Sequence, residues 1–280
     1  MNGGYPYEDL MAPEPRHYQP HDPPEARLHE AIIRREFVPY YHPQYDVLSG
    51  TPLGAEVLVR WYHPERGTVP PSEFLPMAER SGAVLELGDW VAAATCREMA
   101  PWREQWPGFR VFHNCSPRQL ATPAFAQRLL GILSRGGVEP GSVDIEIATQ
   151  TALSLDDTAR GNLAAMRERG VAVVVDDVGA GEFSLPADTA IDGLKLHPAL
   201  MLRLLDDPSA ERLVRRAVDA AGGMPRGVAA NGIEDPSQRE ALIVMGVSRM
   251  QGFLFCRPGP ASGLGGIQVR ALLTRPRMRS

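Results

Sequence analysis

The stretch VAVVVDDVGAG, at residues 171–181, contains the features that decide how this chain folds. Five apolar residues precede two adjacent aspartates, Asp176 and Asp177, and a turn with two glycines follows. A short β-branched run that ends in a glycine-rich turn is typical of a strand buried on both faces of a parallel sheet. Because unpaired buried carboxylates are costly, the two aspartates must be solvated, paired with cations or bound to metal.

The composition is that of a folded protein of 280 residues, long enough for one α/β barrel or two smaller domains. A net charge of −5 argues against binding to a nucleic-acid polymer, which usually requires a basic surface. The three cysteines form no CxxC pair, so a reducing compartment and a cytoplasmic location are expected. No apolar run reaches the roughly 18 residues of a membrane span.

The two ends of the chain differ in composition from the part between them. Residues 1–27 are rich in proline, tyrosine and acidic groups without an apolar period, which predicts a flexible tail. Residues 266–280 form a C-terminal segment that finishes in the basic sequence TRPRMRS, and we expect it to fray. The folded domain is therefore expected at residues 28–265.

Within this domain, segments typical of strands alternate with segments typical of helices. The expected strands are residues 37–43, 55–61, 109–115, 142–148, 171–177, 192–197, 226–231 and 247–253. Several of the helical segments between them begin at Ser, Asp or Pro and end at Gly, as capping chemistry predicts. Eight strands and their helices in about 250 residues predict a (β/α)₈ barrel of the TIM type. An open doubly wound sheet is the alternative.

Polar side chains interrupt or end most of these strands. Because the carboxyl ends of barrel strands meet at one face, these side chains are expected to converge there, although a single one would more often be a cap or a surface group. Carboxylate and amide ligands without a histidine or thiolate cluster select hard cations such as Mg²⁺, Mn²⁺ or Ca²⁺. The residues are Glu56, Asn114, Glu146, Asp176, Asp177, Lys195, Asn231 and Gln251.

Adjacent aspartates in a regular strand point to opposite sides. Asp176 and Asp177 can therefore serve one site only if the strand breaks between or after them, which Gly179 and Gly181 would allow. A carboxylate that bridges two metals about 4 Å apart would suit hydrolysis of a phosphate ester.

Competing motifs are weak. The GAG of VGAGEF lacks the third glycine of a dinucleotide-binding turn, and GxSxG, HExxH and GxxxxGK[ST] are absent. His42, His113 and His197 lie on expected strands without metal-ligand spacing, and His113 is interpreted as a packed core histidine.

A series of motifs runs through the chain in the order AEVLVRWYHPERGTVPPSEFLPMAE, HNCSPRQL, DIEIATQ, VVDDVGAG, LKLH, AANGIEDPSQ and MQGFLFCRP. From residue 37 to residue 258 this series resembles the EAL family of cyclic di-GMP phosphodiesterases. The resemblance implies a barrel with one reversed strand, cyclic di-GMP bound across its carboxyl-end face, and hydrolysis to linear pGpG with Mg²⁺ or Mn²⁺, with Ca²⁺ as an inhibitor.

The resemblance also implies roles for individual residues. Asp177 matches a second-metal ligand, and Lys195 matches the lysine that orients the attacking water. Arg60 matches an arginine that contacts a substrate phosphate, a task for which a forked guanidinium is suited. The matching first-metal ligands are Glu56, Asn114, Glu146 and Asp176, and the other residues expected to line or support the substrate site are Leu58, Gln251 and Glu234.

The sequence departs from the family pattern at several positions. The signature reads EVL because Val57 replaces alanine, Thr149 replaces a glutamate that steadies the loop after the aspartate pair, and His42 replaces a glutamine. Asn231 stands where the family has a second-metal glutamate, and an amide provides an oxygen but no charge.

Two functions therefore remain open at the level of sequence. The first is weak, metal-dependent hydrolysis of cyclic di-GMP, and the second is an inactive receptor that binds the nucleotide and signals to a protein partner. A protein-interaction module without nucleotide is a further alternative, and a homodimer is consistent with any of these.

Overall fold

The computed structural model describes residues 24–181, 185 and 190–264. The first 23 residues of the expected tail, 1–27, and the C-terminal segment 266–280 lie outside the described residues, as does part of the loop after the aspartate pair. Residues 24–27 form the first turn of helix α1 (Pro24–Ile33).

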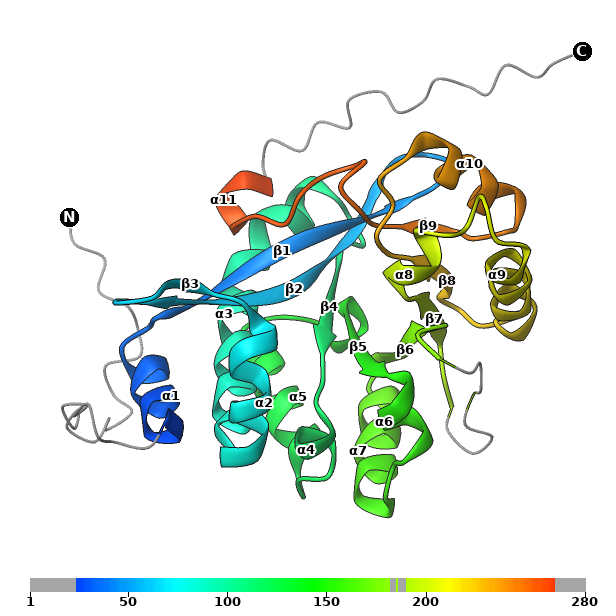
Figure 1. Cartoon of the computed structure of the whole chain (residues 1–280). Helices are drawn as coiled ribbons and strands as arrows, with labels where there is room; N and C mark the ends of the chain where they lie inside the picture. Colours follow the sequence, from blue (N-terminus) through cyan, green and yellow to red (C-terminus); the bar gives the residue numbers. More distant parts are fainter. Residues whose placement is uncertain (1–23, 182–184, 186–189, 265–280) are drawn as a thin grey trace, which may run out of the picture.

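Eight strands close into a barrel, and one short strand lies outside it (Figure 1). The sheet order is β1-β9-β8-β7-β6-β5-β4-β2-β3, and an additional β1–β2 pairing closes the ring. The strands are β1 (Phe37–Asp46), β2 (Pro52–His63), β3 (Gly67–Val69), β4 (Arg110–Asn114), β5 (Val143–Ala148), β6 (Ala172–Val178), β7 (Gly193–Leu196), β8 (Gly227–Ala230) and β9 (Arg249–Met250).

The first strand runs against its neighbours. β1 pairs antiparallel with both β2 and β9, whereas the pairs from β2–β4 round to β8–β9 are parallel. The predicted barrel with one reversed strand is therefore confirmed, and the open doubly wound sheet is wrong. The seven parallel strands bring their carboxyl ends to a single face, as the strand-end argument requires.

The helices surround the barrel and follow local signals in the sequence. Gly82 has a left-handed backbone (φ 90°), which ends α2 and turns the chain directly into α3. Asp156 caps α7 (Asp157–Glu168) by accepting a hydrogen bond from the backbone N–H of Ala159. The remaining helices are α2 (Pro71–Ser81), α3 (Ala83–Gln105), α4 (Pro117–Leu120), α5 (Phe125–Arg135), the 3₁₀ turn Pro140–Ser142, α6 (Thr149–Leu153), α7 (Asp157–Glu168), α8 (Pro198–Met201), α9 (Pro208–Ala220), α10 (Pro236–Val244) and α11 (Ala261–Leu264).

Side chains along each strand point alternately into the barrel and toward the helices outside it. Val111, Ile145 and Val173 face outward and belong to the apolar layer beneath the helices. The barrel interior is polar at both ends. Asp144 at the amino end is fully buried and ion-paired with Arg110 and Arg226. The opposite end of the same strand carries Glu146, which places that carboxylate at the face where ligands bind in barrels of this kind.

Candidate functional site

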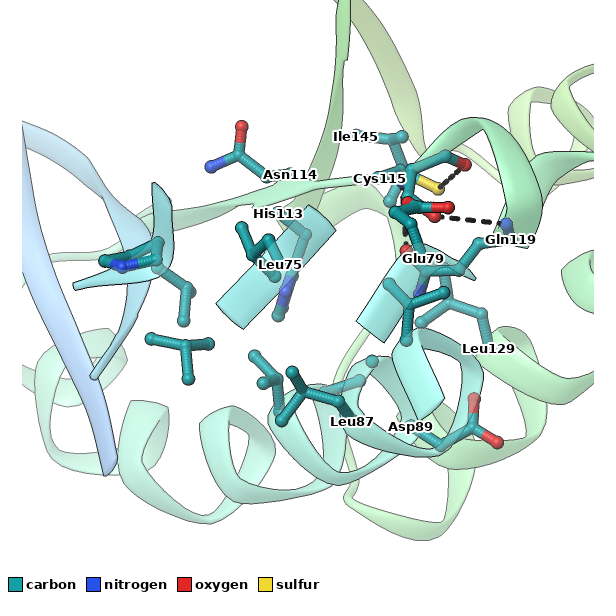
Figure 2. Close-up of a pocket in the computed structure, with 18 of the residues that line it drawn as sticks. Leu75, Glu79, Leu87, Asp89, His113, Asn114, Cys115, Gln119, Leu129 and Ile145 are labelled. Carbon is teal, nitrogen blue, oxygen red and sulfur yellow. Dashed lines mark hydrogen bonds between the residues drawn. The ribbon is translucent and has the colours of Figure 1, made fainter. Parts of the chain in front are cut away.

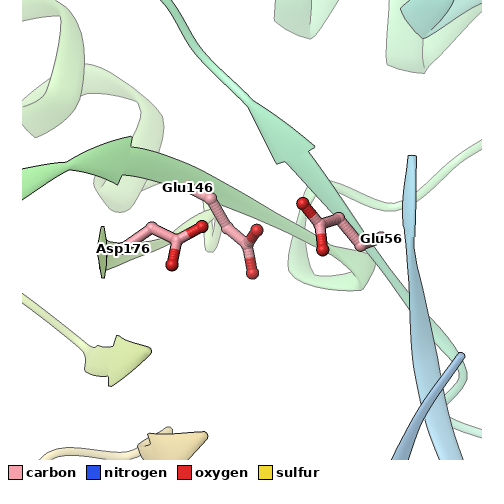
Figure 3. Close-up of side chains that lie close together, drawn as sticks. All are labelled: Glu56, Glu146 and Asp176. Atoms are coloured by element: carbon pink, nitrogen blue, oxygen red, sulfur yellow. The ribbon is translucent and has the colours of Figure 1, made fainter. Parts of the chain in front are cut away.

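Three carboxylates meet at the mouth of the barrel, two from near the carboxyl ends of β5 and β6 and one from the first half of β2. Glu56 comes from β2, Glu146 from β5 and Asp176 from β6, and oxygen atoms of the three lie within 4.8 Å of one another (Figure 3). The pairing of the strands brings these side chains together. Asn114 of β4 lies opposite Glu146 of β5, and Ala148 of β5 lies opposite Asp176 of β6. Parallel strands in this stagger project the side chains into the mouth of the barrel.

Lys195 of β7 lies at the centre of this cluster. Its Nζ is 2.6 Å from Glu146 Oε2, 2.9 Å from Glu56 Oε2 and 3.0 Å from Asp176 Oδ2. The residue is 1% exposed and is the only lysine in the sequence. When all three carboxylates are ionised, the one ammonium leaves two negative charges uncompensated in a buried place. Such a set of hard oxygen donors fits a divalent cation.

Two amides fix the orientation of Glu56. Asn114 Nδ2 donates a hydrogen bond to Glu56 Oε1 (2.8 Å), and Gln251 Nε2 donates to Glu56 Oε2 (2.9 Å). Gln251 is in turn held by Gln44, whose Nε2 donates to Gln251 Oε1 (3.2 Å). With its N–H₂ engaged by Glu56, Asn114 keeps its carbonyl oxygen for a cation, as the ligand assignment requires.

Burial and charge act in opposite directions on these groups. Burial, followed by the neighbouring Glu56 and Asp176, raises the pKa of Glu146 to about 8 in spite of Lys195. Burial also raises the pKa of Glu56, but Lys195 and the hydrogen bonds from Asn114 and Gln251 outweigh it and bring that pKa below its usual value. Burial disfavours the ammonium of Lys195, yet the three carboxylates raise its pKa well above its usual value.

The raised pKa of Glu146 predicts how cation binding depends on pH. Without a cation, Glu146 keeps its proton up to about pH 8, so a cation that binds below this pH must displace that proton. We expect Mn²⁺ affinity to rise by up to about tenfold per pH unit between pH 6 and 8 and to level off above pH 8. Calorimetry in buffers of different ionisation enthalpy should detect about one proton released at pH 7. An affinity that is flat from pH 6 to 8 would contradict the protonated Glu146.

The raised pKa of Glu146 has the opposite effect on the stability of the cation-free protein, which falls as pH rises. Between the ordinary pKa of a glutamate and about 8, the folded state binds more protons than the unfolded state. The stabilisation that this proton provides is complete below the ordinary pKa and is lost as pH rises through 8.

The two adjacent aspartates do not act as a pair. Asp176 points into the cluster, whereas Asp177 is half exposed, with its Oδ1 3.9 Å from His197 Nε2. β6 bulges at Asp177, which has a left-handed backbone (φ 60°) that aspartate tolerates better than most residues, and the register with β7 shifts between Val175 and Val178. The backbone N–H of Asp177 donates to Asp176 Oδ1 (2.7 Å) and so fixes the inward carboxylate.

The other residues singled out from the sequence lie around the cluster rather than in it. Asn231 directly follows β8, and Glu234 is exposed three residues later. Arg60 stands further along β2 than Glu56, with its guanidinium over the ring of Tyr40 at 5.5 Å, and Leu58 is half-buried between them. Thr149 Oγ1 donates to the carbonyl of Asp176 (2.8 Å), so it braces the strand end by one neutral hydrogen bond.

Sequence reasoning missed two residues beside the site, Gln44 and His197. Gln44 lies two positions after His42 on β1, and the pairing of His42 with Glu56 shows that this face of the reversed strand points inward. The sequence signal for Gln44 was a polar residue two positions after His42, on the same face of an expected strand. His197 follows β7 and reaches Asp177 only because the bulge in β6 turns that aspartate outward.

Comparison with known proteins places the chain in a family. The EAL domain matches residues 25–258. Cyclic di-GMP phosphodiesterase PdeR of Escherichia coli (strain K12) is 33% identical over 239 residues, which cover 85% of this chain and 36% of PdeR. The bifunctional diguanylate cyclase/cyclic di-GMP phosphodiesterase MucR of Pseudomonas aeruginosa is 31% identical over 244 residues, 85% of this chain and 35% of MucR. The chain thus spans about a third of the length of these relatives.

A solved structure agrees with the sequence match. The PaMucR phosphodiesterase in complex with c-di-GMP superposes with a TM-score of 0.77 at 30% identity, covering 85% of this chain and 97% of that chain. Across residues 24–181 and 190–264, none of the helices is long and apolar enough to span a membrane. The match over residues 25–258, the barrel with a reversed first strand and the acidic cluster at its mouth show that this chain belongs to the EAL domain family of cyclic di-GMP phosphodiesterases.

Proposed function

We propose that this protein binds cyclic di-GMP across the mouth of the barrel and hydrolyses it slowly to linear pGpG with Mg²⁺ or Mn²⁺. The observation that carries the proposal is the intact cluster of Glu56, Glu146, Asp176 and Lys195 at the strand ends. The relatives PdeR and MucR are named as cyclic di-GMP phosphodiesterases, and the related MucR structure contains c-di-GMP. The unpaired thiols of the three cysteines agree with action in a reducing compartment such as the cytoplasm.

In this reaction a water attacks one phosphorus atom of the cyclic dinucleotide, and the bond from phosphorus to the 3′ oxygen breaks to give pGpG. Glu56, Glu146, Asp176 and the carbonyl oxygen of Asn114 would hold the cation. When bound, the cation supplies positive charge that promotes ionisation of the water and offsets charge building on the phosphoryl oxygens.

The remaining roles belong to side chains of the barrel. Lys195 keeps the three carboxylates together: it donates hydrogen bonds to Glu146 and Asp176 and is ion-paired with Glu56. Its third N–H group would orient the attacking water. The half-exposed carboxylate of Asp177 stands at the mouth, where it would complete a second cation site or accept a proton. Arg60 would pair with a substrate phosphate through its planar guanidinium.

Asn231 is the reason to expect slow turnover. It stands where the family resemblance calls for a glutamate, and a neutral amide beside a second cation loses one charge of attraction. The same substitution favours the second candidate function, a receptor that binds cyclic di-GMP without cleaving it and signals to a protein partner. Both candidates require nucleotide binding, so binding is tested first.

Calorimetry with cyclic di-GMP in excess Ca²⁺, which is expected to support binding without cleavage, tests the shared requirement. We expect saturable binding by the wild-type protein and about 10- to 100-fold weaker binding by Arg60→Ala, because a charge-assisted contact to phosphate is lost. Arg212→Ala, which removes an exposed arginine from α9, is the matched control and should bind like the wild type. No binding by the wild type would overturn both functions and favour a protein-interaction module.

A further inference from the structure

A pocket of about 510 Å³ lies at the amino ends of β6, β7 and β8, at the end of the barrel opposite the acidic cluster (Figure 1). The C-terminal part of α7 forms one side of it, and exposed residues such as Ala164 and Pro225 open it to the surface. Its volume lies within the range of about 300–1,000 Å³ that is typical of small-molecule sites. It is separate from the apolar cavity of Figure 2, which shares Leu58 and Asn114 with the site described above and has no lysine or arginine in its lining.

Two arginines in the lining have N–H groups without a protein partner. Arg226 donates from Nε to Asp144, and neither of its Nη groups forms a hydrogen bond within residues 24–181 or 190–264. Arg167 holds Asp192 through Nε and Nη2 at 2.9 and 2.8 Å, which leaves its Nη1 without a partner among the described residues. The two side chains keep 23% and 33% of their surface exposed. They lie close together, because the backbone N–H of Arg226 donates to the carbonyl of Asp192 (2.7 Å).

The barrel interior behind Arg226 has an excess of positive charge. Asp144 is ion-paired with Arg226 and Arg110, and a third arginine, Arg249 of β9, stands beside them. A Cβ atom on Gly193 would lie 2.5 Å from Cβ of Arg226 and 3.3 Å from Nη2 of Arg249, so these two arginines flank the glycine. One carboxylate therefore faces three guanidinium groups.

Arg249 is the least satisfied of these groups. It is 7% exposed, and its Nε and Nη2 are buried without a hydrogen-bond partner in the part of the chain that the structure describes. Burial lowers the pKa of Arg249 in spite of the nearby carboxylate of Asp144. A buried guanidinium with unpaired N–H groups is costly, and a negative charge brought close to it would offset part of that cost.

The balance of charge at this end of the barrel favours an anion. Four guanidinium groups meet three carboxylates, one of which belongs to the exposed residue Glu168 and is therefore well screened by water. The carboxylate of Asp192 is already engaged by Arg167 and by the backbone N–H of Val173. The four arginines are Arg110, Arg167, Arg226 and Arg249, and the three carboxylates are those of Asp144, Asp192 and Glu168.

We propose that this pocket binds a phosphate group through the Nη groups of Arg226 and the free Nη1 of Arg167, with Arg249 adding its charge from inside the barrel. The planar fork of a guanidinium matches two phosphate oxygens. The phosphate is either the free ion or the end group of a small monoester, for which the volume leaves room. No residue of the cation cluster takes part, so the site does not depend on the proposed hydrolysis.

Calorimetry of the cation-free protein at pH 7 and constant ionic strength tests the site with inorganic phosphate, phenyl phosphate and chloride. Without a cation, the carboxylates at the barrel mouth repel anions, so phosphate binding there is suppressed. We expect one saturable phosphate per chain and at least about tenfold weaker binding of chloride, which cannot engage the guanidinium fork. Tighter binding of phenyl phosphate than of phosphate would identify a monoester as the ligand, and weaker binding would identify the free ion. No saturable binding of either, or chloride binding as tight as phosphate binding, would overturn the site.

Ala164 offers a matched pair of variants on the exposed side of the pocket. Ala164→Glu places a carboxylate beside the ligand and should weaken phosphate binding by about tenfold, whereas Ala164→Gln, of the same size but uncharged, should bind like the wild type. Both variants should fold, because Ala164 is exposed on α7. Unchanged phosphate binding by Ala164→Glu would show that phosphate binds elsewhere and would overturn the assignment.

Urea unfolding with and without phosphate separates ligand binding from a purely structural role of the arginines. Phosphate should raise the unfolding midpoint of the wild type, raise that of Arg249→Met less, and leave that of Arg226→Met unchanged. In phosphate-free buffer, Arg249→Met should be at least as stable as the wild type, because it removes a buried charge that lacks hydrogen-bond partners. Equal stabilisation of the wild type and Arg226→Met by phosphate would mean that the arginines only hold the end of the barrel together.

Discussion

Replacing Lys195 with methionine is expected to slow hydrolysis strongly and to destabilise the cation-free protein by about 3–5 kcal/mol, the usual cost of removing one partner from a buried ion pair. The ammonium is 1% exposed and contacts three carboxylates at 2.6–3.0 Å. Its loss leaves those carboxylates to repel one another. Turnover should fall by about a hundredfold to a thousandfold, as it does when one group of a preorganised charged site is lost.

Urea unfolding with and without Mn²⁺ separates the two roles of Lys195. Added Mn²⁺ should restore more stability to Lys195→Met than to the wild type, because a cation can replace the missing ammonium. Lys195→Met/Glu56→Gln should be more stable than Lys195→Met, since the charge of Glu56, whose pKa lies below its usual value, is then gone as well. If Lys195→Met unfolds at the wild-type urea concentration, the ammonium does not hold the cluster together.

The status of Lys195 as the only lysine gives an independent check. An amine-reactive reagent can modify only this side chain and the terminal amine. A protonated, enclosed ammonium should react slowly in the native protein and rapidly in urea. Rapid modification of native Lys195 would contradict its burial.

Replacing Asn231 with glutamate is expected to raise turnover by about tenfold to a hundredfold, which corresponds to about 1.4–2.8 kcal/mol of transition-state stabilisation. The new carboxylate would stand at the end of β8, where a second cation is expected beside Asp177. Steady-state rates at saturating Mg²⁺ and at saturating Mn²⁺ measure the gain.

Asn231→Gln is the matched control, because glutamine has the size of glutamate without its charge. It should show no gain in rate. A rate for Asn231→Glu equal to that of the wild type would mean that the missing carboxylate is not what limits turnover. Equal gains in both variants would assign the effect to side-chain length.

The fold was largely predictable because the barrel repeats one local pattern. Each of the eight expected strands is found, with ends displaced by a few residues, and the polar residues singled out on them lie at or beside the carboxyl-end face. The stretch at residues 171–181 shows the basis of this success. Its unbroken apolar run requires cover on both faces, and its first aspartate lies in the barrel mouth where the parallel-strand argument places it.

Three-dimensional details of the site were not predictable from spacing. Nothing local reveals that β6 bulges at Asp177, because the bulge depends on the register with β7. The triple contact of Lys195 depends on three other strands, and the place of Gln44 depends on the reversal of β1.

The most direct test of the proposed hydrolysis is incubation of the purified protein with cyclic di-GMP and excess Mg²⁺ or Mn²⁺, with pGpG followed by chromatography. We predict slow formation of pGpG that is lost in Glu56→Ala, since Glu56 is held by Lys195, Asn114 and Gln251 at the centre of the cluster. Formation of no pGpG by wild-type protein that binds cyclic di-GMP would contradict hydrolysis and establish the receptor function in its place.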